Sequence, residues 1–165
     1  MDISKQNIGN AGEYYLASIL SASNFVVTIT LGRNERYDLL AVNPKGKTLK
    51  ISVKARNLEE TSDFPLSQKD EAMEGVDFFY AFIRLNGFKK EPDFWVVPSK
   101  IVAEIVKESH RKWLGGKGKR VEQRKDTPMR LFYTKLTTTS KEILPENWEN
   151  EVAKYYKNIE QLQNV

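Results

Sequence analysis

The chain of 165 residues contains no cysteine and a single histidine, His110. The absence of cysteine excludes disulfide frameworks, thiolate zinc sites, iron–sulfur clusters and cysteine nucleophiles. A single histidine excludes zincin-type helices and nucleases that use two histidines. No hydrophobic run approaches the roughly 18 residues of a membrane helix. The groups that remain available for catalysis are carboxylates, lysines, hydroxyls and hard metals such as Mg²⁺.

The N-terminal segment MDISKQNIGN lacks the basic start and apolar core of a signal peptide. Hydrophobic residues make up 40% and charged residues 29% of the chain, which is typical of a globular protein. The sequence therefore predicts a cytoplasmic protein without membrane contact. The length predicts one domain over 1–165, with a core at about 9–114, a basic loop at 115–130 and a C-terminal helix over 147–162.

Positive charge is concentrated in two blocks of a chain whose net charge is +4. Residues 33–56 carry seven Lys and Arg against two acids, and residues 107–130 carry nine against three. This asymmetry favours phosphate binding, with a solvated basic face as the alternative. DNA is the favoured partner and RNA stays open. The candidate nucleic-acid contacts are Arg33, Arg36, Arg56, Lys117, Lys119 and Arg120.

Hydrophobic periodicity predicts an α/β order of elements. The expected helices cover 10–23, 67–74 and 100–113, the last with Ser99 as N-cap, and the expected strands cover 25–31, 36–42, 48–55, 77–85, 93–97 and 131–134. This order predicts a mixed central sheet flanked by helices, with a C-terminal helical extension.

The turn-forming residues 43–47 predict that strands 36–42 and 48–55 form a hairpin. Residues whose numbers sum to 90 then pair, so that Asp38 faces Ser52 and Arg36 faces Lys54. Since side chains alternate along a strand, this register places Asp38, Ser52 and Lys54 on one face.

Glu13 lies on the same helical stripe as Leu16, Ala17 and Leu20, which must pack on the sheet. A carboxylate in that position is costly unless something positive meets it. A metal ion or Lys54 is the expected partner.

This set of residues resembles the PD-(D/E)XK nuclease superfamily, whose members share the restriction-endonuclease-like fold. The matching motifs are Gly12-Glu13, Tyr37-Asp38 and Ser52-Val53-Lys54. The segment 94–99, FWVVPS, resembles the strand-to-helix join of small Holliday-junction-resolvase-like members. The resemblance implies an α-β-β-β-α-β core.

The resemblance also implies a catalytic set of Glu13, Asp38, Ser52 and Lys54. In it Asp38 binds Mg²⁺ or Mn²⁺, Glu13 supports the metal, and Lys54 orients the attacking water. Ser52 stands where the superfamily has Glu or Gln, and a neutral hydroxyl is a weak ligand, so metal binding is expected to be weak. Asp70 is a secondary candidate for a compensating carboxylate, ahead of Glu35.

The favoured interpretation is a metal-dependent endonuclease that binds DNA and hydrolyses phosphodiester bonds. The alternatives are a non-catalytic nucleic-acid-binding module that retains the fold, and a protein-interaction partner. Many relatives pair two subunits to cut both strands, so the resemblance leaves a homodimer open.

Overall fold

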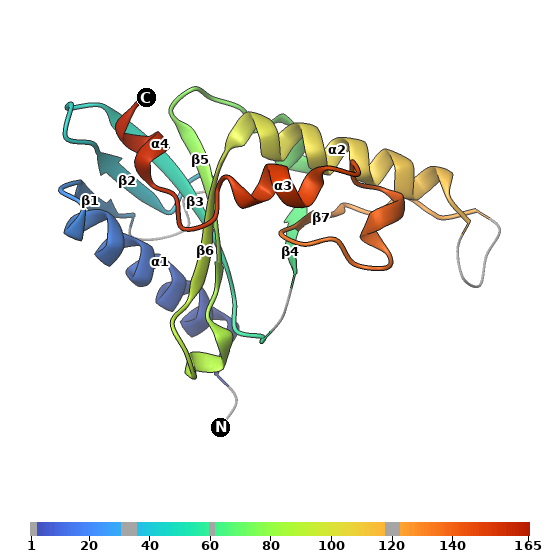
Figure 1. Ribbon diagram of the computed structural model, residues 1–165, viewed down its shortest axis with the longest axis horizontal. Coiled ribbons are helices and arrows are strands. Elements are labelled where there is room, and N and C mark those ends of the chain that lie inside the picture. The colour runs from blue at the N-terminus through green and yellow to red at the C-terminus, as the bar shows by residue number, and fades with distance from the viewer. Residues whose placement is uncertain (1–2, 31–35, 60–61, 118–122) are drawn as a thin grey trace.

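The computed structural model describes residues 3–30, 36–59, 62–117 and 123–165. Its centre is a five-stranded sheet with the order β1-β2-β3-β5-β6 (Figure 1). The strands are β1 (Val26–Ile29), β2 (Leu39–Val42), β3 (Thr48–Arg56), β5 (Phe78–Arg84) and β6 (Asp93–Pro98). β3 and β5 run parallel and the other neighbours antiparallel. The predicted α/β class with a mixed sheet is confirmed.

Different layers cover the two faces of this sheet (Figure 1). α1 (Lys5–Ala22) buries Leu16 and Leu20 against the odd-numbered residues of β2 and β3. The opposite face carries three aromatic residues of β5, Phe78, Tyr80 and Phe82. It is covered by α2 (Ser99–Gly115) and by a two-stranded sheet of β4 (Asp63–Ser67) and β7 (Met129–Tyr133). The 3₁₀ helices are η1 (Gln68–Ala72), η2 (Asn86–Phe88) and η3 (Ser140–Glu142).

The hairpin of β2 and β3 has the predicted register, since Leu39 pairs with Ile51 and Val42 with Thr48. Its turn is built on Asn43, whose side-chain carbonyl accepts the amides of Lys45 at 3.1 Å and Lys47 at 2.9 Å. Ladder pairing ends at Leu39, so Arg36 does not continue the hairpin opposite Lys54 as predicted.

The predicted C-terminal helix over 147–162 is wrong. The structure has two short helices, α3 (Trp148–Ala153) and α4 (Glu160–Gln163), with an extended contact between them. There Tyr155 O accepts Val96 N at 3.1 Å, and Lys157 N donates to Phe94 O at 2.8 Å. The open edge of β6 has backbone groups to satisfy, and this pairing outweighs the helical tendency of the segment.

Two further boundaries differ from prediction. β4 lies where the sequence pattern predicts no strand, although Phe64 and Leu66 alternate as its buried residues. Ser99 is the first residue of α2, and its hydroxyl binds the backbone of Gly75 instead of capping the helix. The predicted basic loop 115–130 lies partly outside the described residues, and its last two positions belong to β7.

Among the described residues, no helix has the length and apolar character needed to cross a membrane.

Candidate functional site

Asp38 lies at the point where β2 separates from β3. Its amide donates to Ile51 O at 2.9 Å, and its own carbonyl accepts the Thr30 hydroxyl at 3.0 Å. One carboxylate oxygen, Oδ2, accepts Val53 N at 2.6 Å and the Ser52 hydroxyl at 3.3 Å. The Asp38 carboxylate therefore binds the Val53 amide of β3 where a carbonyl of a neighbouring strand would otherwise do so. The two hydrogen bonds hold it beside Ser52.

Lys50, Ser52 and Lys54 project from one face of β3, beside Phe78, Tyr80 and Phe82 of β5. Asp38 accepts a hydrogen bond from Ser52, and Lys54 follows Ser52 on the same face of β3, as the predicted register requires. Ser52 is buried and Lys54 half-buried. Within the described part of the chain, Lys54 has no hydrogen bond or ion pair, so its charge is available to the site.

Glu13 belongs to α1, which packs on the odd-numbered face of the sheet, and Gly12 brings this helix very close to β3. A Cβ at Gly12 would lie 2.5 Å from the Cβ of Ala55. Glu13 is half-buried, and the pKa of its carboxyl is raised first by burial and then by the charge of Asp38. No ion pair neutralises Glu13 among the residues described, so Lys54 is not its direct partner as one prediction had it.

Asp70, the secondary candidate, is already committed to the fold. Its Oδ2 accepts the Ser67 amide at 2.7 Å, and its Oδ1 accepts the Tyr80 hydroxyl at 2.7 Å. Burial and this hydrogen bond raise the pKa of Tyr80, which therefore stays a neutral donor. Asp70 is not a compensating carboxylate for the site, and Glu35 lies outside the described residues.

The available donors are two carboxylates and one hydroxyl. No group of three or more His, Cys, Asp or Glu side chains suited to a metal is found in residues 3–30, 36–59, 62–117 and 123–165. Mg²⁺ is commonly held by one or two carboxylates and keeps several waters. Glu13, Asp38 and Ser52 are of the ligand types that such an ion takes, and with only two charged groups they would make a weak set.

The fold is similar to that of a homing endonuclease. The chain superposes on the bacterial homing endonuclease I-Ssp6803I with a TM-score of 0.57, covering 98% of this chain and 95% of that one. The two sequences are 13% identical, so the likeness concerns the fold. No protein-family model matches the chain, and no curated protein matches its sequence.

The predicted nucleic-acid contacts are dispersed over the molecule. Arg36 is exposed next to Asp38, whereas Arg56 forms an ion pair with Asp63 at 3.3 Å. Lys117 is exposed and follows α2 by two residues. The C-terminal end of α2 lies away from α1 (Figure 1). Arg33, Lys119 and Arg120 lie outside the described residues.

Several side chains of the second basic block, residues 107–130, make contacts within the protein. Arg130 is 3% exposed and forms an ion pair with Glu71. Arg124 donates to Trp113 O at 2.6 Å and lies over the Trp113 ring. His110 binds Asp126 at 2.7 Å. These basic side chains therefore contribute less to a nucleic-acid surface than the charge count suggests.

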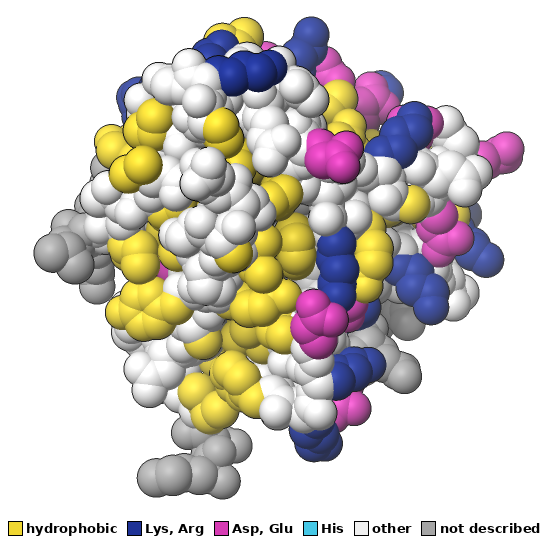
Figure 2. Space-filling model, turned by 60° about the vertical axis from the view of Figure 1, so that its left-hand side comes forward, with side chains coloured by type: hydrophobic (Ala, Val, Ile, Leu, Met, Phe, Trp, Pro, Cys, Tyr) yellow, Lys and Arg dark blue, Asp and Glu magenta, His cyan; other side chains and the backbone are white. Residues whose placement is uncertain are grey.

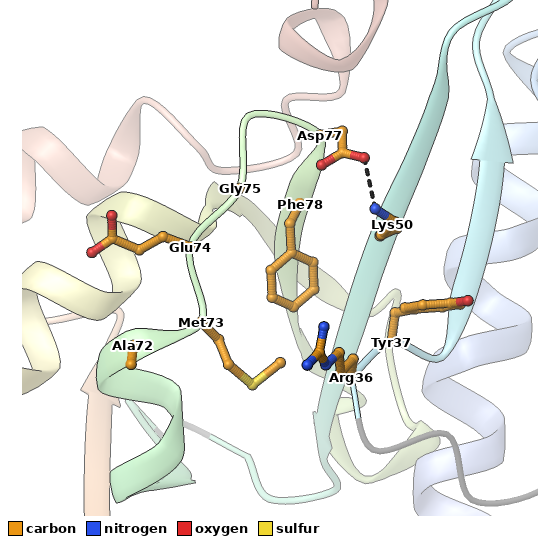
Figure 3. Close-up of a pocket in the computed structure, with 9 residues that line it drawn as sticks. All are labelled: Arg36, Tyr37, Lys50, Ala72, Met73, Glu74, Gly75, Asp77 and Phe78. Atoms are coloured by element: carbon orange, nitrogen blue, oxygen red, sulfur yellow. Dashed lines mark hydrogen bonds and ion pairs between the residues drawn. The ribbon is translucent and has the colours of Figure 1, made fainter.

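A cavity of about 310 Å³, which sequence reasoning missed, adjoins the site on the face of Ser52 and Lys54. Three of its lining residues come from the approach to β2 and from β3: Arg36, Tyr37 and Lys50. The other wall is formed by residues 72–75 with Asp77 and Phe78 (Figure 3). Lys50 is paired with Asp77 at 2.9 Å, and this pairing lowers the pKa of Asp77.

Proposed function

We propose that the protein is a metal-dependent endonuclease of the PD-(D/E)XK type that binds DNA and hydrolyses phosphodiester bonds. The observation that carries this proposal is the hydrogen-bonded pair of Asp38 and Ser52, with Lys54 next on the same face of β3. The charge of Asp38 also acts on Glu13 of α1. Burial and the charge of Asp38 raise the pKa of Glu13, and a cation bound near both carboxylates would relieve this unfavourable interaction. The similarity to a homing endonuclease fold supports the proposal at the level of architecture.

Asp38 and Glu13 would hold Mg²⁺ or Mn²⁺, and the Ser52 hydroxyl would complete the set. When bound, the ion supplies Lewis acidity and lowers the pKa of water. Lys54 orients the attacking water through its ammonium group, and its half-buried position keeps that group on the face of Ser52. The hydrogen bonds from Val53 and Ser52 fix the carboxylate of Asp38 before substrate arrives.

DNA would reach this site through exposed cations, with Arg36 nearest to Asp38 along the chain. A homodimer would place two such sites on the two strands of a duplex. The absence of a third carboxylate within the described residues favours one competing function, a nucleic-acid-binding module that keeps the fold without cleaving.

Plasmid nicking with Mg²⁺ or Mn²⁺ separates these two functions. The endonuclease should nick supercoiled DNA, and both Lys54→Ala and Asp38→Ala should abolish nicking. Asp38→Ala should retain DNA binding, because it removes a negative charge that repels phosphate. Lys45→Ala, which changes an exposed lysine of the hairpin turn, is the matched control and should nick like the wild type. Equal residual nicking by wild type and Asp38→Ala would favour the binding module.

A further inference from the structure

The cavity beside the site has an apolar lining and a guanidinium that the cleavage chemistry does not use, and the Phe78 ring, 7% exposed, forms part of its wall. The Met73 side chain and the Arg36 guanidinium converge below the Phe78 ring, whereas the Glu74 carboxylate and the Tyr37 hydroxyl point away (Figure 3). Aromatic rings and guanidinium planes are the groups on which unstacked bases are held in proteins.

The cavity lies next to the candidate site along β3. Lys50 lines the cavity, and Ser52 is the next residue on the same face, about 7 Å along the strand. Arg36 and Tyr37, which also line it, immediately precede Asp38. A nucleotide whose phosphate lies at Asp38 and Lys54 would have its neighbour beside the cavity.

The lining favours a base over a phosphate. Asp77 neutralises Lys50, and Ala72, Met73 and Phe78 supply apolar surface. A volume of about 310 Å³ lies at the small end of ligand pockets, which suits one base.

We propose that this cavity binds the unpaired base of a nucleotide adjacent to the phosphodiester at the candidate site. The inference rests on the proposed function for its substrate class. Because a base in a duplex is paired and stacked, it cannot enter a cavity without being extruded. The protein should therefore favour nucleic acid with an unpaired nucleotide over a fully paired duplex.

Fluorescence anisotropy in EDTA tests the proposal without any cleavage. The probes are a fully paired DNA duplex, the same duplex with one unpaired adenine, and a third with an abasic residue at that position. Wild type should bind the unpaired-adenine duplex about tenfold more tightly than the other two. Equal affinity for the adenine and abasic duplexes would mean that only the backbone is read, and would overturn the proposal.

Filling the cavity provides a second measurement. Met73→Trp should remove the preference and leave the affinity for the paired duplex unchanged. Met129→Trp is the matched control, because Met129 is exposed on β7 and does not line this cavity. Arg36→Ala removes an exposed guanidinium that lines the cavity, and it should also reduce the preference. A preference that survives both Met73→Trp and Arg36→Ala would overturn the assignment to this cavity.

The outcomes distinguish this inference from the proposed function. A preference for the unpaired base without nicking in Mg²⁺ or Mn²⁺ would support the cavity and contradict the enzyme. Nicking without a preference for the unpaired base would support the enzyme and contradict the cavity. Absence of binding to all three DNAs would overturn both.

Discussion

Ser52 is the residue on which the strength of the metal site depends. It is 5% exposed and donates its hydroxyl to Asp38, where a carboxylate would add a charged ligand. Ser52→Glu should tighten Mn²⁺ binding by about tenfold or more, because affinity for hard ions rises with ligand charge. Isothermal titration with Mn²⁺ measures the change. Ser21→Glu, on the exposed side of α1, is the control and should leave the affinity for Mn²⁺ unchanged. An unchanged affinity in Ser52→Glu would show that the metal binds elsewhere.

Glu13 gives the site a measurable pH dependence. Burial and the charge of Asp38 raise the pKa of its carboxyl in the folded protein. The folded chain then binds this proton more tightly than the unfolded chain, so stability falls as pH rises through the raised pKa. Glu13→Gln should melt at a higher temperature than wild type at pH 7 without metal. The difference should vanish at acid pH, where both chains carry a neutral side chain at this position.

Thermal melts followed by circular dichroism across this pH range check the prediction. Glu146→Gln, which changes an exposed acid remote from the site, should show no such trend. If wild type were the more stable protein at pH 7 in metal-free buffer, a cation of the chain would already be neutralising Glu13.

At the scale of elements, the contact between α1 and β3 positions Glu13. A methyl group at Gly12 would collide with Ala55, whereas nothing lies within 4 Å of a Cβ at Gly9 in the same helix. Gly12→Ala should therefore lower the free energy of unfolding by about 1–3 kcal/mol, as overpacked sites do. Gly9→Ala should raise it by about 0.5–1 kcal/mol through helix propensity. Urea titration compares the two variants, and equal stability would show that the close approach is not required.

The sequence predicted the elements whose local pattern agrees with their packing. β3 alternates apolar and polar residues, and Asn43 to Lys47 form a short turn, so both the hairpin register and the grouping of Ser52 with Lys54 followed. The first helix followed from the stripe of Leu16 and Leu20.

The errors occurred where distant segments decide the structure. The C-terminal segment leaves the helical conformation because β6 has an open edge, which its own residues do not reveal. β4 forms because β7 pairs with it from more than sixty positions away. The carboxylate of Asp70 accepts a hydrogen bond from the Tyr80 hydroxyl, a contact between two elements that the sequence does not reveal. The cavity of Arg36 and Met73 likewise joins segments that are separated along the chain.

For the whole molecule, the distribution of charge indicates which surface can meet DNA. Figure 2 views the side formed by α1, β1 and α4, where hydrophobic side chains gather over the middle and charged ones lie mainly to one side. From Tyr14 to Thr30 the sequence has no charged residue, so α1 and β1 offer phosphate no cations along this stretch. The opposite side of the sheet carries Lys50, Lys54 and α2 with its basic residues Lys107, Arg111 and Lys112, and DNA should bind there.

The two basic regions are far enough apart to contact one duplex at separate places. Ser99 lies against Gly75 at the cavity, and α2 extends from it for 17 residues, about 25 Å, toward Lys117. That distance corresponds to about seven base pairs. Since Arg56, Arg124 and Arg130 are engaged within the protein, we expect about four phosphate contacts, fewer than the charge blocks suggest.

The salt dependence of duplex binding tests this arrangement. The logarithm of the association constant should fall against the logarithm of salt concentration with a slope of roughly −3 to −4, about −0.9 per phosphate contact. Lys117→Ala should reduce the magnitude of the slope by about 0.9, because it removes one contact at the distal end of α2. Lys5→Ala, at the start of α1, should leave the slope unchanged. Anisotropy titrations over a series of NaCl concentrations measure all three proteins. A wild-type slope near zero would exclude phosphate contacts as the source of affinity, and an unchanged slope in Lys117→Ala would confine DNA to the region of Asp38.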